Sequence, residues 1–418
     1  MRDIKCRAYD ILHKIDNYVK NYEDELDKPR RKYMRDMILG TMRSGSLILS
    51  QIAQKTQGIT DRCENSHQTE KRLSYNLNNE RWSILGMRDI HYRNMHLYVT
   101  NQTLIILDLS DIQKPYGRKL PDLKSVRDGS TGEIGLGYHL ISGIMKINKR
   151  MILPLWLDSF SSDEVGFKSQ NAEILDVIKA IFSATNGLGV LVYDRDLDAR
   201  HIFDDLIDMH IRFVIRLKGD RFLVFNDGKN MEKAIVNKKI ANVNLRYSTM
   251  IPVKRPRRGG RTHWKLRYDY FPVTLPRRES DELYLVVGHR EMKTEPIYLL
   301  VNVPISCPKD ALKWLKGYFS RWGIEDTFRF WKQKFGLEDI RTTDIDNFKK
   351  LLWIAVVAFA FMTAYLLTDL KLRRDLIGIT HRPGLAKHIA FLYYRIRNGV
   401  DKLFEAFSPE LLSQNLST

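Results

Sequence analysis

The feature that most restricts the fold is an uncharged apolar stretch, Leu351–Leu367, in the last fifth of the chain. Its seventeen residues (LLWIAVVAFAFMTAYLL) contain no charged side chain. A stretch of this length lies at the lower limit for a transmembrane helix, and a helix buried in a large soluble core has the same composition. Basic residues flank both ends, so no charge asymmetry orients a membrane span. We therefore expect a core helix, with a membrane-anchored protein as the alternative.

The net charge indicates a polyanionic partner. The 418 residues include 68 Lys and Arg against 50 Asp and Glu, which gives a net charge of +18. Hydrophobic residues make up 44% of the chain, so disordered and low-complexity classes are excluded. Nucleic acid is the first candidate partner, and an anionic membrane surface is the second.

The three cysteines indicate a reducing compartment. Cys6, Cys63 and Cys307 are too few and too far apart for a disulfide framework, and the first residues lack the apolar core of a signal peptide. We therefore expect a cytoplasmic protein. Cys63 and His67 are possible zinc ligands, but a structural zinc site needs four ligands, so two unrelated surface residues are the preferred interpretation.

Hydrophobic patterns divide the chain into five segments. Residues 1–96 have a helical, polar pattern with basic runs at 28–35 and 71–72, which suit either nucleic acid or a solvated helix face. Residues 97–221 alternate strands with helices, which indicates an α/β core. The expected strands are 97–99, 104–108, 135–145, 150–157, 189–194 and 210–216, and the expected helices are 171–184 and 199–209.

The remaining segments differ in pattern. Residues 222–306 lose the helical signal, which predicts a β-rich insertion with strands at 282–287 and 296–303. A basic loop precedes those strands and holds Lys254, Arg255, Arg257, Arg258, Arg261, Lys265 and Arg267. Residues 307–370 are helical again and complete the core, and residues 371–418 form a helical C-terminal region that suits dimerisation.

Two expected buried strands end in an aspartate, Asp108 and Asp194. Open α/β sheets place functional groups at the carboxyl ends of central strands, although such an acid can equally cap the next element. Asp111 and Asp196 are alternatives, but only the first pair directly ends the apolar runs. Paired carboxylates can hold a divalent metal, and a basic surface suits a phosphate-bearing substrate.

A third feature lies within residues 310–336, where Tyr318, Arg321, Glu325 and Lys332 follow one another at offsets of 3, 7 and 14. On one continuous helix these positions fall at roughly 0°, −60°, −20° and −40°, a single stripe about 21 Å long. Such a stripe offers a carboxylate for metal and Tyr, Arg and Lys donors for phosphates. The alternative is an ordinary helix with an Arg321–Glu325 ion pair. Gly323 lowers the helix propensity of this segment.

The spacing Tyr-x2-Arg-x3-Glu-x6-Lys resembles the signature of a large group of insertion-sequence transposases, the DDE enzymes, and the four residues match it without a gap. The resemblance covers roughly residues 35–370. It implies an α/β fold: a ribonuclease-H-like mixed sheet with flanking helices, a β-rich insertion and a helical N-terminal DNA-binding domain. It also implies that Asp108, Asp194 and Glu325 are the catalytic residues and the ligands of two Mg²⁺ or Mn²⁺ ions.

The same resemblance implies a cut-and-paste transposase that cleaves double-stranded DNA at the terminal inverted repeats of its element and transfers the strands into target DNA. Such an enzyme is expected to pair two DNA ends as a homodimer in a prokaryotic nucleoid, without membrane contact. The residues expected to bind DNA phosphates are Tyr318, Arg321, Lys332, Arg216, Arg255, Arg257 and Arg258, and His139 and Arg195 are further candidates. The alternative is a metal-dependent nuclease, or a DNA-binding relative, that does not transpose.

Overall fold

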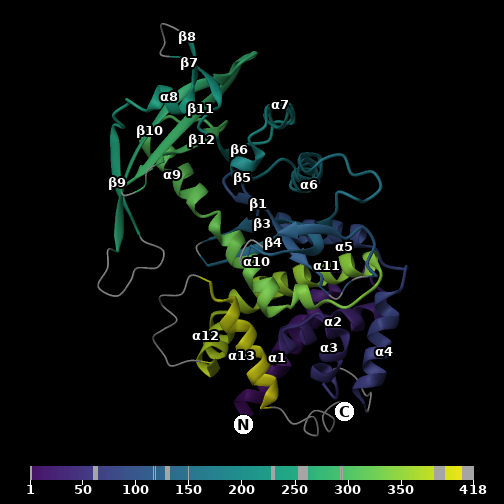
Figure 1. Ribbon diagram of the computed structural model, residues 1–418. Helices are drawn as coiled ribbons and strands as arrows, with labels where there is room; N and C mark the ends of the chain where they lie inside the picture. Colours follow the sequence, from purple (N-terminus) through teal and green to yellow (C-terminus); the bar gives the residue numbers. More distant parts are fainter. Residues whose placement is uncertain are drawn as a thin grey trace. The chain divides into compact units, whose positions relative to one another are not determined.

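The computed structural model of the protein describes residues 2–59, 65–115, 117, 119–127, 132–148, 150–226, 231–252, 262–291, 293, 295–380 and 391–406 (Figure 1). The chain forms two compact units. The first contains Met1–Val99, Asp108–Asn186 and Gly323–Thr418, and the second contains Thr100–Leu107 and Gly187–Trp322. Strand β1 (Leu104–Gln113) belongs to both, because the boundary falls within it.

The first unit opens with helices, as the helical pattern of residues 1–96 predicts. Those among the described residues are α1 (Arg2–Lys20), α2 (Lys28–Ser44), α3 (Leu49–Thr56), α4 (Ser66–Leu77) and α5 (Ile84–His96). The Asp27 side chain caps α2 by accepting the Arg30 amide, and Gly45 ends it with a φ of 68°. The expected strand at 97–99 is wrong. Leu97 is instead the C-terminal cap of α5, and its side chain is 86% exposed. Three apolar residues next to a helix end are too few to form a strand that pairs with a neighbour.

The sheet of the first unit combines β2 (Lys124–Arg127), β3 (Ile134–Lys146) and β4 (Ile152–Phe160), all antiparallel neighbours. Strands β3 and β4 confirm the expected strands at 135–145 and 150–157, and α6 (Gln170–Ala184) confirms the expected helix at 171–184. The Ser169 hydroxyl caps α6 by accepting the Ala172 amide.

The uncharged stretch is a core helix. It forms the second part of α11 (Ile345–Phe361) and the π-helical segment η3 (Met362–Leu367). Ile345–Leu367 is long and apolar enough to cross a membrane, and its most apolar part has a mean hydropathy of 2.0. Yet 89% of that part is buried inside the protein. It packs against β4 and α2, and the Thr363 hydroxyl donates to the Ile152 carbonyl at 2.8 Å. Helices α12 (Leu370–Thr380) and α13 (Tyr393–Glu405) follow.

The second unit begins with three parallel strands: the start of β1, β5 (Val190–Tyr193) and β6 (Phe213–Arg216). A short helix η1 (Arg195–Leu197) and α7 (Arg200–Asp208) connect β5 to β6 in the strand–helix–strand order that the sequence predicts. Residues 105–107 of β1, all of β5 and residues 213–215 of β6 are apolar and buried, as expected of strands covered on both faces.

Residues 222–306 form the predicted β-rich region: β7 (Phe222–Asn226), β8 (Met231–Ile235), β9 (Tyr247–Pro252), β10 (His263–Leu275), β11 (Arg278–Arg290) and β12 (Ile297–Val301), with the short helix α8 (Val236–Ile240). Strand β12 pairs antiparallel with β6, so the region extends the parallel strands in the order β5-β6-β12-β11-β10-β7-β8, and β9 also pairs with β10. The fold is therefore mixed α/β, with a large mixed sheet and flanking helices.

Candidate catalytic and phosphate-binding residues

Asp108 lies on β1 in the first unit, but it does not end the strand as expected. Strand β1 continues to Gln113, and the following Lys114 amide donates to the Leu136 carbonyl of β3 at 2.7 Å. The polar run after Asp108 stays extended because β3, a strand distant in sequence, supplies hydrogen-bond partners. The Asp108 side chain is half-buried and accepts the Leu109 amide at 3.1 Å.

Asp111, the alternative to Asp108, has a structural partner. Its carboxylate lies 2.7 Å from Nδ1 of His139 on the neighbouring strand β3. The His139 ring also packs against Phe160, with ring centroids 5.4 Å apart. His139 therefore orients Asp111 within the sheet.

Asp194, in the second unit, lies directly after β5, so the expected strand end is confirmed. Its half-buried carboxylate also caps η1, because it accepts the Asp196 amide at 2.9 Å. Asp196 itself is exposed on η1. The capping and catalytic interpretations do not compete, since one carboxylate oxygen can accept an amide while the other remains for a ligand.

The single stripe from Tyr318 to Lys332 is wrong, because two helices replace the continuous one. Helix α9 (Pro308–Phe319) ends before the turn at 320–321, and α10 begins at Trp322 and ends at Lys334. The Ser320 hydroxyl donates to the Gly317 carbonyl at 2.6 Å, and its amide is shared between the Lys316 and Gly317 carbonyls. Serine side chains compete with the backbone in this way and favour helix ends.

The break separates the four signature residues into two groups. Tyr318 is buried on α9 in the second unit, and Arg321 lies in the turn. Glu325 and Lys332 share α10 in the first unit, seven residues apart and thus on one helix face. Glu325 is exposed in the first turn, while Lys332 lies 3.4 Å from the Glu338 carboxylate.

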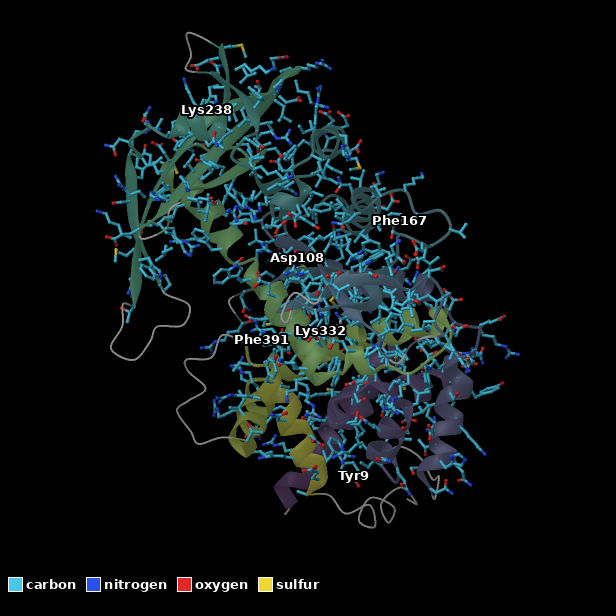
Figure 2. All side chains as sticks on the ribbon, viewed as in Figure 1. Tyr9, Asp108, Phe167, Lys238, Lys332 and Phe391 are labelled. Atoms are coloured by element: carbon cyan, nitrogen blue, oxygen red, sulfur yellow. The ribbon has the colours of Figure 1, made fainter. Side chains whose placement is uncertain are left out.

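One residue that the sequence did not single out, Lys114, joins the segments that carry Asp108 and Glu325. It follows β1 directly, and its buried Nζ donates to the carbonyls of Leu337, Glu338 and Ile340 at 2.7, 3.1 and 3.2 Å. These carbonyls belong to the turn after α10 that contains η2 (Leu337–Asp339). Figure 2 labels Asp108 and Lys332 on the two segments. Lys114 thus fixes the end of α10 to the end of β1.

The expected phosphate-binding arginines have different outcomes. Arg216 ends β6 in the second unit and is half-buried. Arg255, Arg257 and Arg258 lie outside the described residues, as do Lys254, Arg261 and Cys63. The pattern missed Arg290, which ends β11 with its guanidinium 5.3 Å from the Phe319 ring. Burial, followed by the Arg216 charge, lowers the pKa of Arg290.

Four arginines of the basic runs in the N-terminal helices form ion pairs within the protein. Arg30, Arg31 and Arg35 pair with Asp27, Glu23 and Asp16 at 3.0, 3.0 and 3.3 Å. Arg72 lies 2.6 Å from Asp36, whose side chain is fully buried. Arg35 joins α2 to α1 and Arg72 joins α4 to α2, which favours the structural interpretation of both runs.

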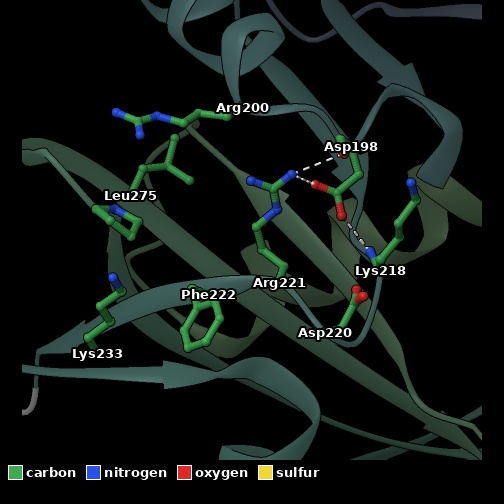
Figure 3. Close-up of a pocket in the computed structure, with 9 residues that line it drawn as sticks. Asp198, Arg200, Lys218, Asp220, Arg221, Phe222, Lys233 and Leu275 are labelled. Atoms are coloured by element: carbon green, nitrogen blue, oxygen red, sulfur yellow. Dashed lines mark hydrogen bonds and ion pairs between the residues drawn. The ribbon is translucent and has the colours of Figure 1, made fainter.

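A basic pocket of about 420 Å³ lies within the second unit (Figure 3). Asp198 organises its wall: its carboxylate forms an ion pair with Arg221 and accepts the Lys218 amide at 2.6 Å. Lys233 lies 5.4 Å from the ring of Phe222, which is 47% exposed. The full lining is Asp198, Arg200, Lys218, Asp220, Arg221, Phe222, Lys233, Leu275 and Pro276. An aromatic ring among lysines suits nucleic acid.

Carboxylates dominate the candidate metal ligands, and their oxygens suit Mg²⁺ or Mn²⁺. Within the part of the chain that the structure describes, no three His, Cys, Asp or Glu side chains are gathered closely enough to hold a metal ion. Asp108 and Glu325 belong to one unit and Asp194 to the other. Three carboxylates are a donor set that fits a divalent metal.

Residues 161–361, just under half of the chain, match a protein-family model described as a transposase DDE domain. The chain is an enzyme that acts on DNA. The matched segment contains Asp194, Glu325 and the other three signature residues, whereas Asp108 precedes it. No curated protein matches the chain. A solved structure, the piggyBac transposase synaptic complex with hairpin DNA, resembles it with 9% identity and a TM-score of 0.44, over 98% of this chain and 82% of that chain.

Proposed function

We propose that this enzyme is a cut-and-paste transposase, which cleaves DNA at the ends of a mobile element and joins the freed strands to target DNA. The observation that carries the proposal is the transposase DDE domain match, which contains Asp194 at a buried strand end and Glu325 on an exposed helix face. The parallel strands β1, β5 and β6, bordered by antiparallel strands, support a ribonuclease-H-like core.

In this proposal Asp108, Asp194 and Glu325 bind two divalent metal ions. When bound, Mg²⁺ or Mn²⁺ would activate a water or a 3′-hydroxyl and stabilise the leaving oxygen. Tyr318, Arg321 and Lys332 would bind phosphates near the cut and orient the scissile bond. Lys114 would position Glu325 indirectly, because it fixes the turn that follows α10.

DNA ends would lie on the positive surfaces of the second unit and on the N-terminal helices. Contacts to backbone phosphates provide most of the affinity in such complexes. Arginines of α2 and α4 are already paired with carboxylates. We therefore expect the second unit to contribute more to DNA binding than the N-terminal helices. A homodimer formed on paired DNA ends and a nucleoid location in a prokaryotic cytoplasm complete the proposal.

The test uses a linear DNA that carries the inverted repeats flanking the gene, a target plasmid and Mg²⁺. We expect cuts at the repeat ends and joined products in the plasmid. Cuts without joining would identify a nuclease, and the absence of both would contradict the proposal.

The assignment of the acids is tested by a matched pair, Asp194→Asn and Asp196→Asn. The two residues lie on the same turn, and both changes remove one negative charge. We expect Asp194→Asn to lower the cleavage rate by about 10³-fold or more, and Asp196→Asn to lower it only slightly. Equal effects would show that Asp194 has no special role.

A further inference from the structure

We propose that Arg216, Arg290 and Tyr318 form a binding site for one phosphate of the DNA backbone on the face of the second unit's sheet that α9 covers. Arg290 is the new member, and it is the residue on which the site depends. The proposal rests on the proposed function only in taking DNA as the ligand.

Strand pairing places the two arginines on the same face of the sheet. Arg216 on β6 is opposite Leu299 on β12, and Leu299 is opposite Val286 on β11. Side chains that are directly opposite share a face, and along a strand every second residue returns to it. Arg290 follows Val286 by four residues, so it lies on the face of Arg216.

Helix α9 brings Tyr318 to that same face. The helix approaches β11 so closely at Gly288 that a Cβ atom there would lie 2.7 Å from Cδ2 of Leu315. Tyr318 follows Leu315 by three residues and therefore lies on the same side of the helix, one turn further on. Phe319 also contributes, since its ring packs against the Arg290 guanidinium. A glycine on β11 thus permits the close packing that assembles the site.

The charges of this cluster are unbalanced. Among the described residues, neither Arg216 nor Arg290 forms an ion pair with a carboxylate, in contrast to the arginines of α2 and α4. Arg290 is half-buried, and the Arg216 charge and the Tyr318 ring are both near enough to act on it electrostatically. Two like charges held together destabilise each other, and an anion between them removes that cost.

The chemistry of the site selects a phosphate. Guanidinium groups donate in a planar fork that matches the oxygens of a phosphate, and a tyrosine hydroxyl adds a further donor. One phosphodiester carries one negative charge and exposes two unesterified oxygens, so two arginines can share it.

The primary experiment measures binding of the full-length protein to a 30-base-pair duplex by fluorescence anisotropy, in EDTA, across a salt series. We expect Arg290→Gln to weaken binding about tenfold and to reduce the slope of log K against log salt by about 0.9. The control is Lys238→Gln, which removes one positive charge from an exposed position of the same unit on α8. If Arg290→Gln weakens binding no more than the control does, the proposal is wrong.

Two further measurements separate this site from a structural role. Arg216→Gln alone and the double variant Arg216→Gln/Arg290→Gln should each weaken DNA binding by nearly the same factor as Arg290→Gln alone, because both arginines hold one phosphate. Independent factors that multiply would contradict a shared site. Thermal unfolding of Arg290→Gln without DNA should show an unchanged or higher Tm, since a repulsion is removed. A Tm lowered by about 5 °C or more would assign Arg290 to folding and overturn the proposal.

Because EDTA prevents metal-dependent cleavage, the outcome is independent of the proposed transposition. Binding through Arg290 by a protein that cannot cut would support this site and contradict the proposed function. If the wild-type protein cuts DNA but Arg290→Gln does not weaken binding, the proposed function is supported and this phosphate site is contradicted.

Discussion

Arginines of the N-terminal helices and arginines of the second unit's sheet have opposite surroundings. Arg30, Arg31 and Arg72 each face a carboxylate within 3.0 Å, and in the case of Arg72 that carboxylate is fully buried. Arg216 and Arg290 instead lie on one face of a sheet, and the Arg216 charge contributes to lowering the pKa of Arg290. A basic run in a sequence therefore does not identify a DNA-binding surface, because the partner of each cation decides whether it stabilises the fold or remains for a ligand.

The largest effect that tests this comparison should come from Arg72→Gln. The change leaves the Asp36 carboxylate buried without its guanidinium, which lies 2.6 Å away. We expect the free energy of unfolding to fall by about 3–5 kcal/mol, measured by urea denaturation. The DNA affinity of the folded variant should stay within about twofold of the wild type. A stable Arg72→Gln variant with weak DNA binding would reverse the roles assigned to the two regions.

Lys114→Met extends the comparison to a lysine. The ammonium group donates to three carbonyls near η2, and the methionine would leave all three without this donor. We expect a loss of about 3 kcal/mol in the free energy of unfolding. The matched control is Lys119→Met, because Lys119 is exposed nearby in the same unit. Equal stability of the two variants would mean that Lys114 does not fix the end of α10.

His91 should give the N-terminal helices a pH-dependent stability. Complete burial lowers its pKa to about 4, although Nε2 lies 2.8 Å from the Pro154 carbonyl. The folded protein therefore keeps His91 neutral, while the unfolded chain gains a proton below about pH 6.5. Stability from this residue is present above pH 6.5 and is lost as the pH falls toward 4, by about 2 kcal/mol between pH 6.5 and 5.

The measurement for this third prediction is urea denaturation at pH 7, 6 and 5. The His91→Gln variant is the control, since its side chain does not titrate. If the free energy of unfolding changes with pH in the same way in the wild type and in His91→Gln, His91 is protonated as readily in the folded state as in the unfolded chain.

The smallest effect is expected for Arg31→Gln. Its ion pair with Glu23 is solvent-exposed on both sides, at 31% and 53%. Exposed pairs contribute little, so the free energy of unfolding should change by less than about 0.5 kcal/mol, and the DNA affinity by less than about threefold. A tenfold loss of affinity would show that this run binds DNA despite its ion pairs.

The sequence predicts the parts of the molecule that local pattern controls. Periodicity locates the N-terminal helices, and the apolar run before Asp194 locates β5 and its end. Local pattern fails where a distant partner decides. Strand β1 continues past Asp108 because β3 pairs with it, and the helix breaks at Ser320 because a side chain takes a backbone acceptor.

The same limit explains the residues that were missed. Lys114 and Arg290 act through carbonyls and rings that are distant in sequence, or through strands whose register no local window contains. The alternation of Val286, Gly288 and Arg290 does place them on one face of a strand, but only pairing with β12 and β6 adds Arg216 to that face. The acids carry a local signal, whereas the phosphate site does not.

The most direct test of the account is a crossed measurement of cutting and binding for Glu325→Gln and Arg290→Gln, on the same end-bearing DNA. We predict that Glu325→Gln binds this DNA like the wild type but cuts it at least about 10³-fold more slowly in Mg²⁺. Arg290→Gln should bind this DNA about tenfold more weakly and, at subsaturating DNA, cut it more slowly for that reason. Wild-type cutting by Glu325→Gln would contradict the central claim that acids perform the chemistry in a protein whose basic residues hold the DNA.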